Sequence, residues 1–190
     1  MPNANTPGGL RPVRGVGSQP YNDGTQMFFV PAADTTALYI GDPVILAGSA
    51  DAAGVATVTR AAATGAITGV VVGFMPNGTT DMVGFRAAST SAYALVQTNP
   101  DILFEIQDTA GTIVAADIGL NADMTIAIGN NFSKRSGFVL NAASKAVTAT
   151  LQLRIKGLSQ RPNNDFGAFA KVLVQINNST ETAGTNSPGL

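Results

Sequence analysis

The alternation of apolar and polar positions is clearest between residues 99 and 108, where the sequence predicts a β-strand. After a Pro-Asp turn, apolar residues alternate one by one with mixed or polar residues, and the apolar positions are Ile102, Phe104 and Ile106. A period of two places these side chains on one face of a strand and does not fit a helix. A half-buried strand needs a neighbour on each edge and a second layer over its apolar face. We therefore expect this segment to lie inside a β-sheet.

Short apolar or alternating runs recur along the chain between turn residues. The predicted strands are residues 27–30, 37–40, 44–47, 55–60, 67–74, 82–86, 91–98, 113–116, 124–128, 138–140, 151–156 and 171–177. Gly69 and Gly73 indicate a bulge or a close backbone approach inside the fifth of these runs. The pair Asn77-Gly78 favours a tight hairpin turn. In the loop 160–169 we expect Phe166 and Phe169 to pack against the body.

No run has a convincing period of 3.6 residues, so we predict an all-β protein. Many short strands with frequent turns are typical of a single antiparallel β-barrel or β-sandwich, here over residues 27–177. Residues 1–26 are rich in Pro and Gly and hold only isolated apolar residues. This composition predicts an extended N-terminal arm that another chain holds, and whose deletion leaves the body folded. Residues 178–190 are predicted to form a flexible C-terminal tail.

The composition narrows the classes of function. Charged residues make up 12% of the chain, about half the usual ~25%, and the formal net charge is -1. A surface with few charges repels neighbouring subunits weakly and suits permanent contact with them. Nucleic-acid binding needs a basic face that releases counterions, so we expect no nucleic-acid partner.

The chain contains no Cys, His or Trp, and the absence of Cys and His together removes most catalytic and metal chemistry. Thiolate nucleophiles, disulfides, structural zinc sites and Ser-His catalysis are all excluded. The first residues lack an apolar signal segment, and no apolar run approaches the ~20 residues of a membrane span. We therefore expect a chain that is neither secreted nor attached to a membrane, in which the Asn-X-Ser/Thr sequons carry no glycans.

Paired carboxylates are the remaining route to catalysis. Asp101 and Glu105 share a face of the predicted strand, but four residues separate them by roughly 13 Å, beyond the ~9.5 Å limit for inverting glycosidases. A cross-strand partner such as Asp81 or Asp123 could lie closer, but the chain has only two Glu and ten Asp, mostly beside turns. We therefore predict that the protein is not an enzyme and has no catalytic residues or cofactor.

A second group of oxygen side chains, Asp117, Asn121 and Asp123, lies in a Gly-containing loop and offers a calcium site as an alternative. The spacing is not that of an EF-hand and no Glu closes the site, so Asx turns are the favoured interpretation and no metal is predicted.

The N-terminal arm is the predicted contact surface. Arg11 and Arg14 could contact nucleic acid, but two charges without aromatic neighbours favour docking on an acidic protein surface. The predicted partner-binding residues are Leu10, Arg11, Val13, Arg14 and Val16.

Several segments together resemble the capsid decoration, or cement, proteins of tailed bacteriophage heads. They are residues 39–51 (YIGDPVILAGSAD), 67–74 (ITGVVVGF), 99–107 (NPDILFEIQ), 117–123 (DIGLNAD), 136–140 (SGFVL) and the stretch from 151–155 (LQLRI) to Asn177. The resemblance implies a β-barrel or β-tulip-like body on the outer capsid surface that bridges neighbouring major capsid subunits, with terminal arms reaching across them. The expected partners are the major capsid protein and further copies of the chain, with a trimer favoured and a dimer as the alternative. The family has no active-site residues to transfer.

Other functions stay open. The first is a major capsid protein or tail component of the same virion, although the chain is short for a major capsid fold and lacks the long helix of such shells. The second is a surface module that binds a carbohydrate or receptor, which usually presents exposed aromatic side chains. An enzyme is the third.

Overall fold

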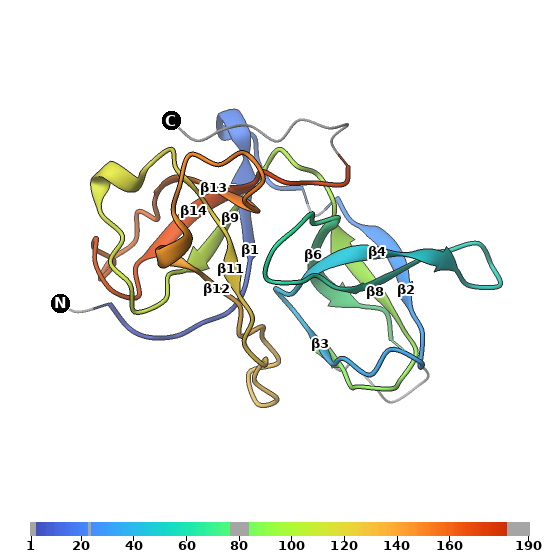
Figure 1. The fold of residues 1–190 in the computed structure, drawn as a ribbon. Coiled ribbons are helices and arrows are strands. Elements are labelled where there is room, and N and C mark those ends of the chain that lie inside the picture. Colours follow the sequence, from blue (N-terminus) through green and yellow to red (C-terminus); the bar gives the residue numbers. More distant parts are fainter. Residues whose placement is uncertain (1–2, 23, 77–83, 182–190) are drawn as a thin grey trace.

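The structure, a computed structural model, describes residues 3–22, 24–76 and 84–181. Within these ranges the chain forms β-strands joined by turns and three single-turn 3₁₀ helices, η1 (Val16–Ser18), η2 (Ala115–Asp117) and η3 (Ala142–Ser144). Figure 1 shows the strands gathered into two groups, one around β9 and one around β4. The prediction of an all-β protein with antiparallel sheets is confirmed.

The first group is a five-stranded antiparallel sheet in the order β1-β9-β14-β13-β10. Its strands are β1 (Arg11–Gly15), β9 (Ile102–Gln107), β14 (Lys171–Ile176), β13 (Leu153–Leu158) and β10 (Asn121–Ala122). As the alternation predicts, β9 has a partner on each edge, and Phe104, opposite Pro12 and Val174, is fully buried. A short pair, β11 (Met124–Thr125) with β12 (Val139–Leu140), completes this group.

The second group is a closed ring of five strands in the order β2-β5-β4-β6-β8. Its strands are β2 (Gln26–Val30), β5 (Ala56–Arg60), β4 (Pro43–Ala50), β6 (Gly69–Phe74) and β8 (Ala92–Gln97). All neighbours are antiparallel except β2 and β5. The register of β6 shifts between Val71 and Gly73, which is the bulge that the strand glycines predict. The pair β3 (Leu38–Tyr39) with β7 (Phe85–Arg86) lies beside the ring.

The two groups share a hydrophobic core. The larger core cluster contains residues of the five-stranded sheet together with Ala61, Ile67 and Val70 from the ring side. A smaller cluster, including Val30 and Val96, fills the ring itself. The sequence predicts one barrel or sandwich; the structure instead divides the strands between an open sheet and a ring and packs the two together.

The N-terminal segment differs from the predicted arm. Leu10 is 1% exposed within the larger core, and its backbone N–H donates to the carbonyl oxygen of Gly41 at 2.9 Å. Residues 11–15 add β1 to the free edge of β9. The protein's own sheet therefore holds this segment, because an edge strand offers backbone partners that the composition of the added segment does not reveal.

The C-terminal tail also begins later than predicted. The N–H of Ile67 donates to the carbonyl oxygen of Asn178 at 2.9 Å, and the N–H of Thr180 donates back to Ile67 at 3.0 Å. Residues 178–181 thus pair with the ring side of the molecule, and residues 182–190 lie outside the described part of the chain.

Three local predictions fail. Phe166 is 42% exposed instead of packed against the body, and Phe169 is half-buried at a positive φ of 59°. The predicted strand 113–116 is an isolated bridge at Ile113 followed by η2, and the strand predicted over 124–128 ends at Thr125. The turn predicted at Asn77-Gly78 lies outside the described residues. No helix within the described ranges is long and apolar enough to cross a membrane.

The burial of Leu10 gives the first prediction. Leu10→Ala removes a fully buried side chain and leaves a cavity, so the free energy of unfolding should fall by about 2–5 kcal/mol in urea denaturation. Val13→Ala is the matched control, because Val13 lies in the same segment but is 43% exposed and should cost about 0.5 kcal/mol or less. Equal losses in the two variants would mean that the segment does not dock on the core.

Candidate partner-binding surface

Of the two carboxylates that the sequence singles out, Glu105 has structural partners. Both oxygens of Glu105 are bound, one by Arg161 Nη1 at 2.7 Å and one by the Ser159 hydroxyl at 2.5 Å. This carboxylate therefore holds the loop after β13 onto β9. Asp101 lies outside β9 at an exposed position.

The alternative calcium ligands also face different partners. Asp117 forms an ion pair with Lys145 at 2.6 Å and accepts the N–H of Val114 at 2.8 Å, which closes the turn at η2. Asp123 accepts the N–H of Gln152 at 3.2 Å, and the Asn121 amide donates to the carbonyl oxygen of Thr148 at 3.0 Å. The described residues hold no group of three or more His, Cys, Asp or Glu placed to bind a metal ion.

Two buried aspartates have raised pKa values. Burial, only partly offset by Thr109 and Lys145, raises the pKa of Asp108 to about 7. Burial likewise raises the pKa of Asp42 to about 6, against the opposing effects of hydrogen bonds and of Arg60. One oxygen of Asp108, Oδ2, has no hydrogen-bond partner among the described residues. Neither aspartate lines the cavity described below, so we interpret both as determinants of stability.

Between β11 and β12, residues 126–136 form a loop that projects from the molecule (Figure 1, bottom centre). Its apolar side chains point to solvent: Ile126 is 40% exposed, Ile128 is 84% exposed and Phe132 is 97% exposed. Large apolar residues exposed to this extent on one projection are typical of a contact surface.

Hydrogen bonds within the 126–136 loop fix its shape. The Asn130 side-chain oxygen accepts the N–H groups of Phe132 and Ser133 at 2.8 and 3.1 Å. The backbone of Asn130 exchanges hydrogen bonds with Arg135 and Lys134, at 2.9 and 2.8 Å. Lys134 adopts a positive φ of 58° to close the turn. The loop is therefore preorganised around Phe132.

The base of the loop is anchored to the pair β3/β7. Ile40 donates its N–H to Lys134 at 3.3 Å, and its carbonyl oxygen accepts the N–H of Ser136 at 2.9 Å. The Lys134 ammonium lies 4.3 Å from the centre of the Phe85 ring, which stacks on Tyr39 at 5.2 Å. These contacts hold the projection rigidly against the rest of the molecule.

Gly129 allows this anchoring because its backbone touches the Tyr39 ring. A Cβ atom at this position would lie 2.2 Å from a ring carbon, closer than any real contact. Glycine is therefore required for the loop to approach the aromatic pair.

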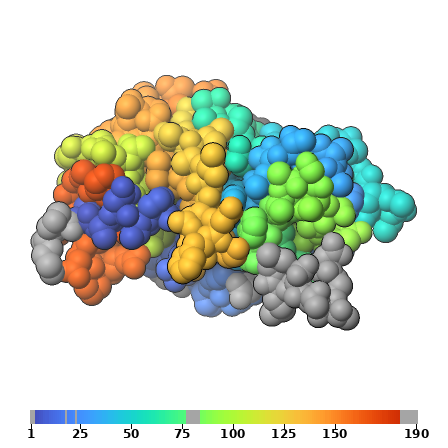
Figure 2. Space-filling model, turned by 90° about the horizontal axis from the view of Figure 1, so that it is seen from below, coloured from blue at the N-terminus to red at the C-terminus, as the bar shows by residue number. Residues whose placement is uncertain are grey.

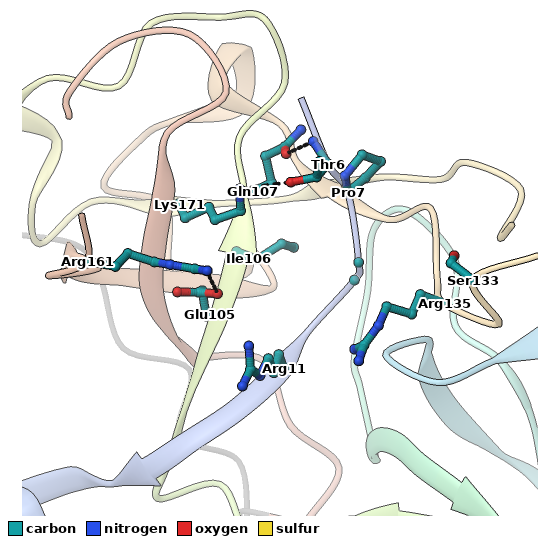
Figure 3. A pocket seen from close by; sticks show the side chains of 12 residues that line it. Thr6, Pro7, Arg11, Glu105, Ile106, Gln107, Ser133, Arg135, Arg161 and Lys171 are labelled. Carbon is teal, nitrogen blue, oxygen red and sulfur yellow. Dashed lines mark hydrogen bonds and ion pairs between the residues drawn. The ribbon is translucent and has the colours of Figure 1, made fainter. Parts of the chain in front are cut away.

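A cavity of about 400 Å³ opens beside the loop. Its walls come from residues 6–9 and Arg11 of the N-terminal segment, from β9, from Arg161 after β13, from the start of β14 and from Ser133 and Arg135 of the loop. Figure 2 shows the N-terminal segment in dark blue next to the loop in gold, and Figure 3 shows the side chains around the cavity. The charged lining residues are Arg11, Arg135, Arg161, Lys171 and Glu105.

The predicted partner-binding residues divide into three groups. Arg11 lines the cavity, whereas Leu10 is buried in the core and is not presented to a partner. Val13, Arg14 and Val16 are exposed along β1 and η1, away from the cavity lining.

Phe132 is not among the residues that the sequence predicts to bind a partner. The available signal was an isolated aromatic residue in a polar loop.

The buried Asp108 predicts a dependence of stability on pH. Because the pKa of Asp108 is raised from its ordinary value of 3.8 to about 7 in the folded state, the native protein keeps a proton that the unfolded chain loses above about pH 4. The free energy of unfolding should therefore fall as pH rises from about 4 through 7. Asp108→Asn should reduce that fall by on the order of a few kcal/mol in urea denaturation across this range. Asp101→Asn, at an exposed position, should follow the wild-type curve, and a wild-type slope in Asp108→Asn would contradict the assignment.

The close approach of Gly129 to Tyr39 gives a third prediction. Gly129→Ala should lower the free energy of unfolding by about 1–3 kcal/mol, because the added methyl group must displace the ring. Gly157→Ala is the control, since a Cβ atom at Gly157 meets no other atom within 4 Å. Thermal denaturation of both variants measures the difference, and an unchanged melting temperature in Gly129→Ala would show that the loop base is not tightly packed.

Comparisons with known proteins supply no relative for this surface. No family model matches the chain, and neither the curated proteins nor the solved structures contain a significant match.

Proposed function

We propose that the protein is a structural component of a bacteriophage virion, a capsid decoration protein that binds the outer surface of the head and bridges major capsid subunits. The observation that carries the proposal is the rigid 126–136 loop, which holds Ile128 and Phe132 almost fully in solvent. The resemblance of the sequence segments to cement proteins is the reason for proposing a bacteriophage head as the binding partner.

The loop has the physical properties of a docking element. Burying a side chain such as Phe132 in a partner contributes roughly 1.5–3 kcal/mol, and the loop is already ordered before binding. Because Phe132 and Ser133 donate hydrogen bonds to Asn130 and the loop base is anchored at Ile40, little conformational entropy is lost on docking. A preorganised apolar projection therefore suits long-lived attachment to a shell.

The composition supports the same role. With 12% charged residues, neighbouring copies on a shell repel one another weakly. The core shared by the sheet and the ring makes the body stiff, so a contact at each end of it would resist separation of the subunits beneath. The proposal includes an oligomer in which copies of the chain surround a shared axis, with a trimer favoured over a dimer.

A second candidate function is a module that binds a carbohydrate or receptor on the virion surface. The observation that favours it is Phe132, which is 97% exposed and offers a ring face for stacking on a sugar.

Binding to shells tests the proposal. The purified protein should co-sediment with shells assembled from the major capsid protein of the same genome, and imaging of the particles should show a fixed copy number per capsomer. Phe132→Ser should weaken this binding by about tenfold or more, because the main apolar contact is lost. Phe166→Ser is the matched control: Phe166 is also exposed, at 42%, but lies outside the loop and the cavity lining.

Two results would count against the decoration role. One is wild-type protein that stays in the supernatant at every shell concentration. The other is binding to a glycan array that Phe132→Ser abolishes, which would select the carbohydrate-binding function instead.

A further inference from the structure

The cavity beside the 126–136 loop carries an excess of positive charge. Four cationic side chains line it, together with a single carboxylate, Glu105. We infer that this cavity binds the carboxylate side chains of an acidic peptide segment of a partner protein. The inference rests on the proposed function for the source of that segment, a subunit of the shell.

The cations are not all engaged within the protein. Arg161 is paired with Glu105 at 2.7 Å, and the Lys171 ammonium donates to the Thr6 hydroxyl at 3.0 Å. The side chains of Arg11 and Arg135 are exposed and make no hydrogen bond or ion pair with any described residue. Two guanidinium groups in the lining are therefore available to a ligand (Figure 3).

The contact between Glu105 and Arg161 shows how a carboxylate fits this lining. Glu105 accepts from the Arg161 guanidinium and from the Ser159 hydroxyl, and its side chain is only 12% exposed. Arg161 uses one guanidinium nitrogen, Nη1, on one oxygen of Glu105, and the Ser159 hydroxyl binds the other oxygen, so charge-assisted hydrogen bonding to a carboxylate already occurs in this lining. Arg11 and Arg135 can bind further carboxylates in the same manner.

The distribution of the cations favours a peptide over a single compact anion. The four side chains come from four separate segments: the N-terminal strand, the loop before β12, the loop after β13 and the start of β14. A cavity of about 400 Å³ holds several side chains, and its charges are spread around the walls. An acidic segment can place several carboxylates at separate points, so that each can reach a different cation of the lining.

The walls of the cavity are fixed before a ligand binds. Gln107 of β9 accepts the N–H of Thr6 at 2.7 Å and donates to the Asn5 side chain at 2.8 Å, which holds the N-terminal wall in place. At Gly9, a Cβ atom would lie 2.3 Å from the carbonyl oxygen of Gly41, so this wall is in close backbone contact with the ring side. A preformed cavity loses little entropy on binding.

The position of the cavity links it to the docking loop. Ser133 and Arg135 belong both to the cavity lining and to the loop that presents Phe132. One partner can therefore fill the cavity with acidic side chains while an apolar pocket on it receives Phe132. Charge in the cavity would then orient the partner, and apolar burial at the loop would hold it.

Titration with peptides tests the inference on the full chain. A fluorescent oligoglutamate peptide should bind the wild-type protein with an affinity that falls as salt concentration rises, whereas the matching oligoglutamine peptide should not bind. Arg11→Gln/Arg135→Gln should weaken oligoglutamate binding by about tenfold. Lys156→Gln is the control, because Lys156 is an exposed cation outside the cavity lining, and should bind like the wild type. Circular dichroism spectra identical to wild type would establish that the double variant is folded.

Three results would overturn the inference. They are equal oligoglutamate affinity in the wild type and the double variant, inorganic phosphate binding more tightly than the peptide, and a single-stranded oligonucleotide binding more tightly through the same two arginines. The titration contains no shell, so it is independent of the decoration role. Oligoglutamate binding without shell binding would retain the acidic-segment site and remove only the proposed source of the segment.

Discussion

The pairing of β9 with strands on both of its edges is the constraint on which the rest of the structure depends. Phe104 fills the core beneath this strand, and β1 and β14 satisfy its backbone groups on either side. The same strand carries Glu105 and Gln107, which hold the loop after β13 and the N-terminal segment in place. Since both segments form walls of the charged cavity, the strand that completes the core also builds the candidate site.

The sequence predicts the parts of the fold whose signal is local. The alternating runs of β9 and β14 are six residues long. β9 begins after the Pro-Asp turn inside the predicted segment 99–108 and ends one residue before its limit, and β14 ends one residue before the predicted limit of 171–177. Strands of only two residues, such as β3 and β10, exist because tertiary partners lie beside them, and no local pattern identifies their limits. The N-terminal segment differs from the predicted arm for a related reason. Its backbone pairs with β9, about ninety residues away in sequence, and pairing at a sheet edge requires little of the side chains.

The candidate site was harder to predict than the fold, because it consists of side chains brought together by that long-range pairing. Arg11 was identified from the basic character of the N-terminal segment, and it does line the cavity. Arg161 lies in the predicted loop 160–169 and Lys171 is the first residue of the predicted strand 171–177, and at both positions a charge is ordinarily a solvated surface group. Only the packing of β14 against β9 places them around one hollow. The burial of Leu10 could not be predicted either, because an isolated apolar residue in a Pro- and Gly-rich segment does not indicate that it packs into a core.

The cluster of cations around the cavity matters because the rest of the chain carries few charges. The chain has 11 Lys and Arg residues and a net charge of -1, so four cations around one cavity stand out against a weakly charged surface. A field of this kind acts over roughly a Debye length, about 8–10 Å at physiological salt, and therefore orients a partner as it approaches. The 126–136 loop contributes to binding only when it touches the partner, because apolar burial requires direct contact. The charged cavity and the neighbouring 126–136 loop can thus have different roles in recognition. Charge selects the orientation of the partner, and the rigid loop determines how long the complex lasts.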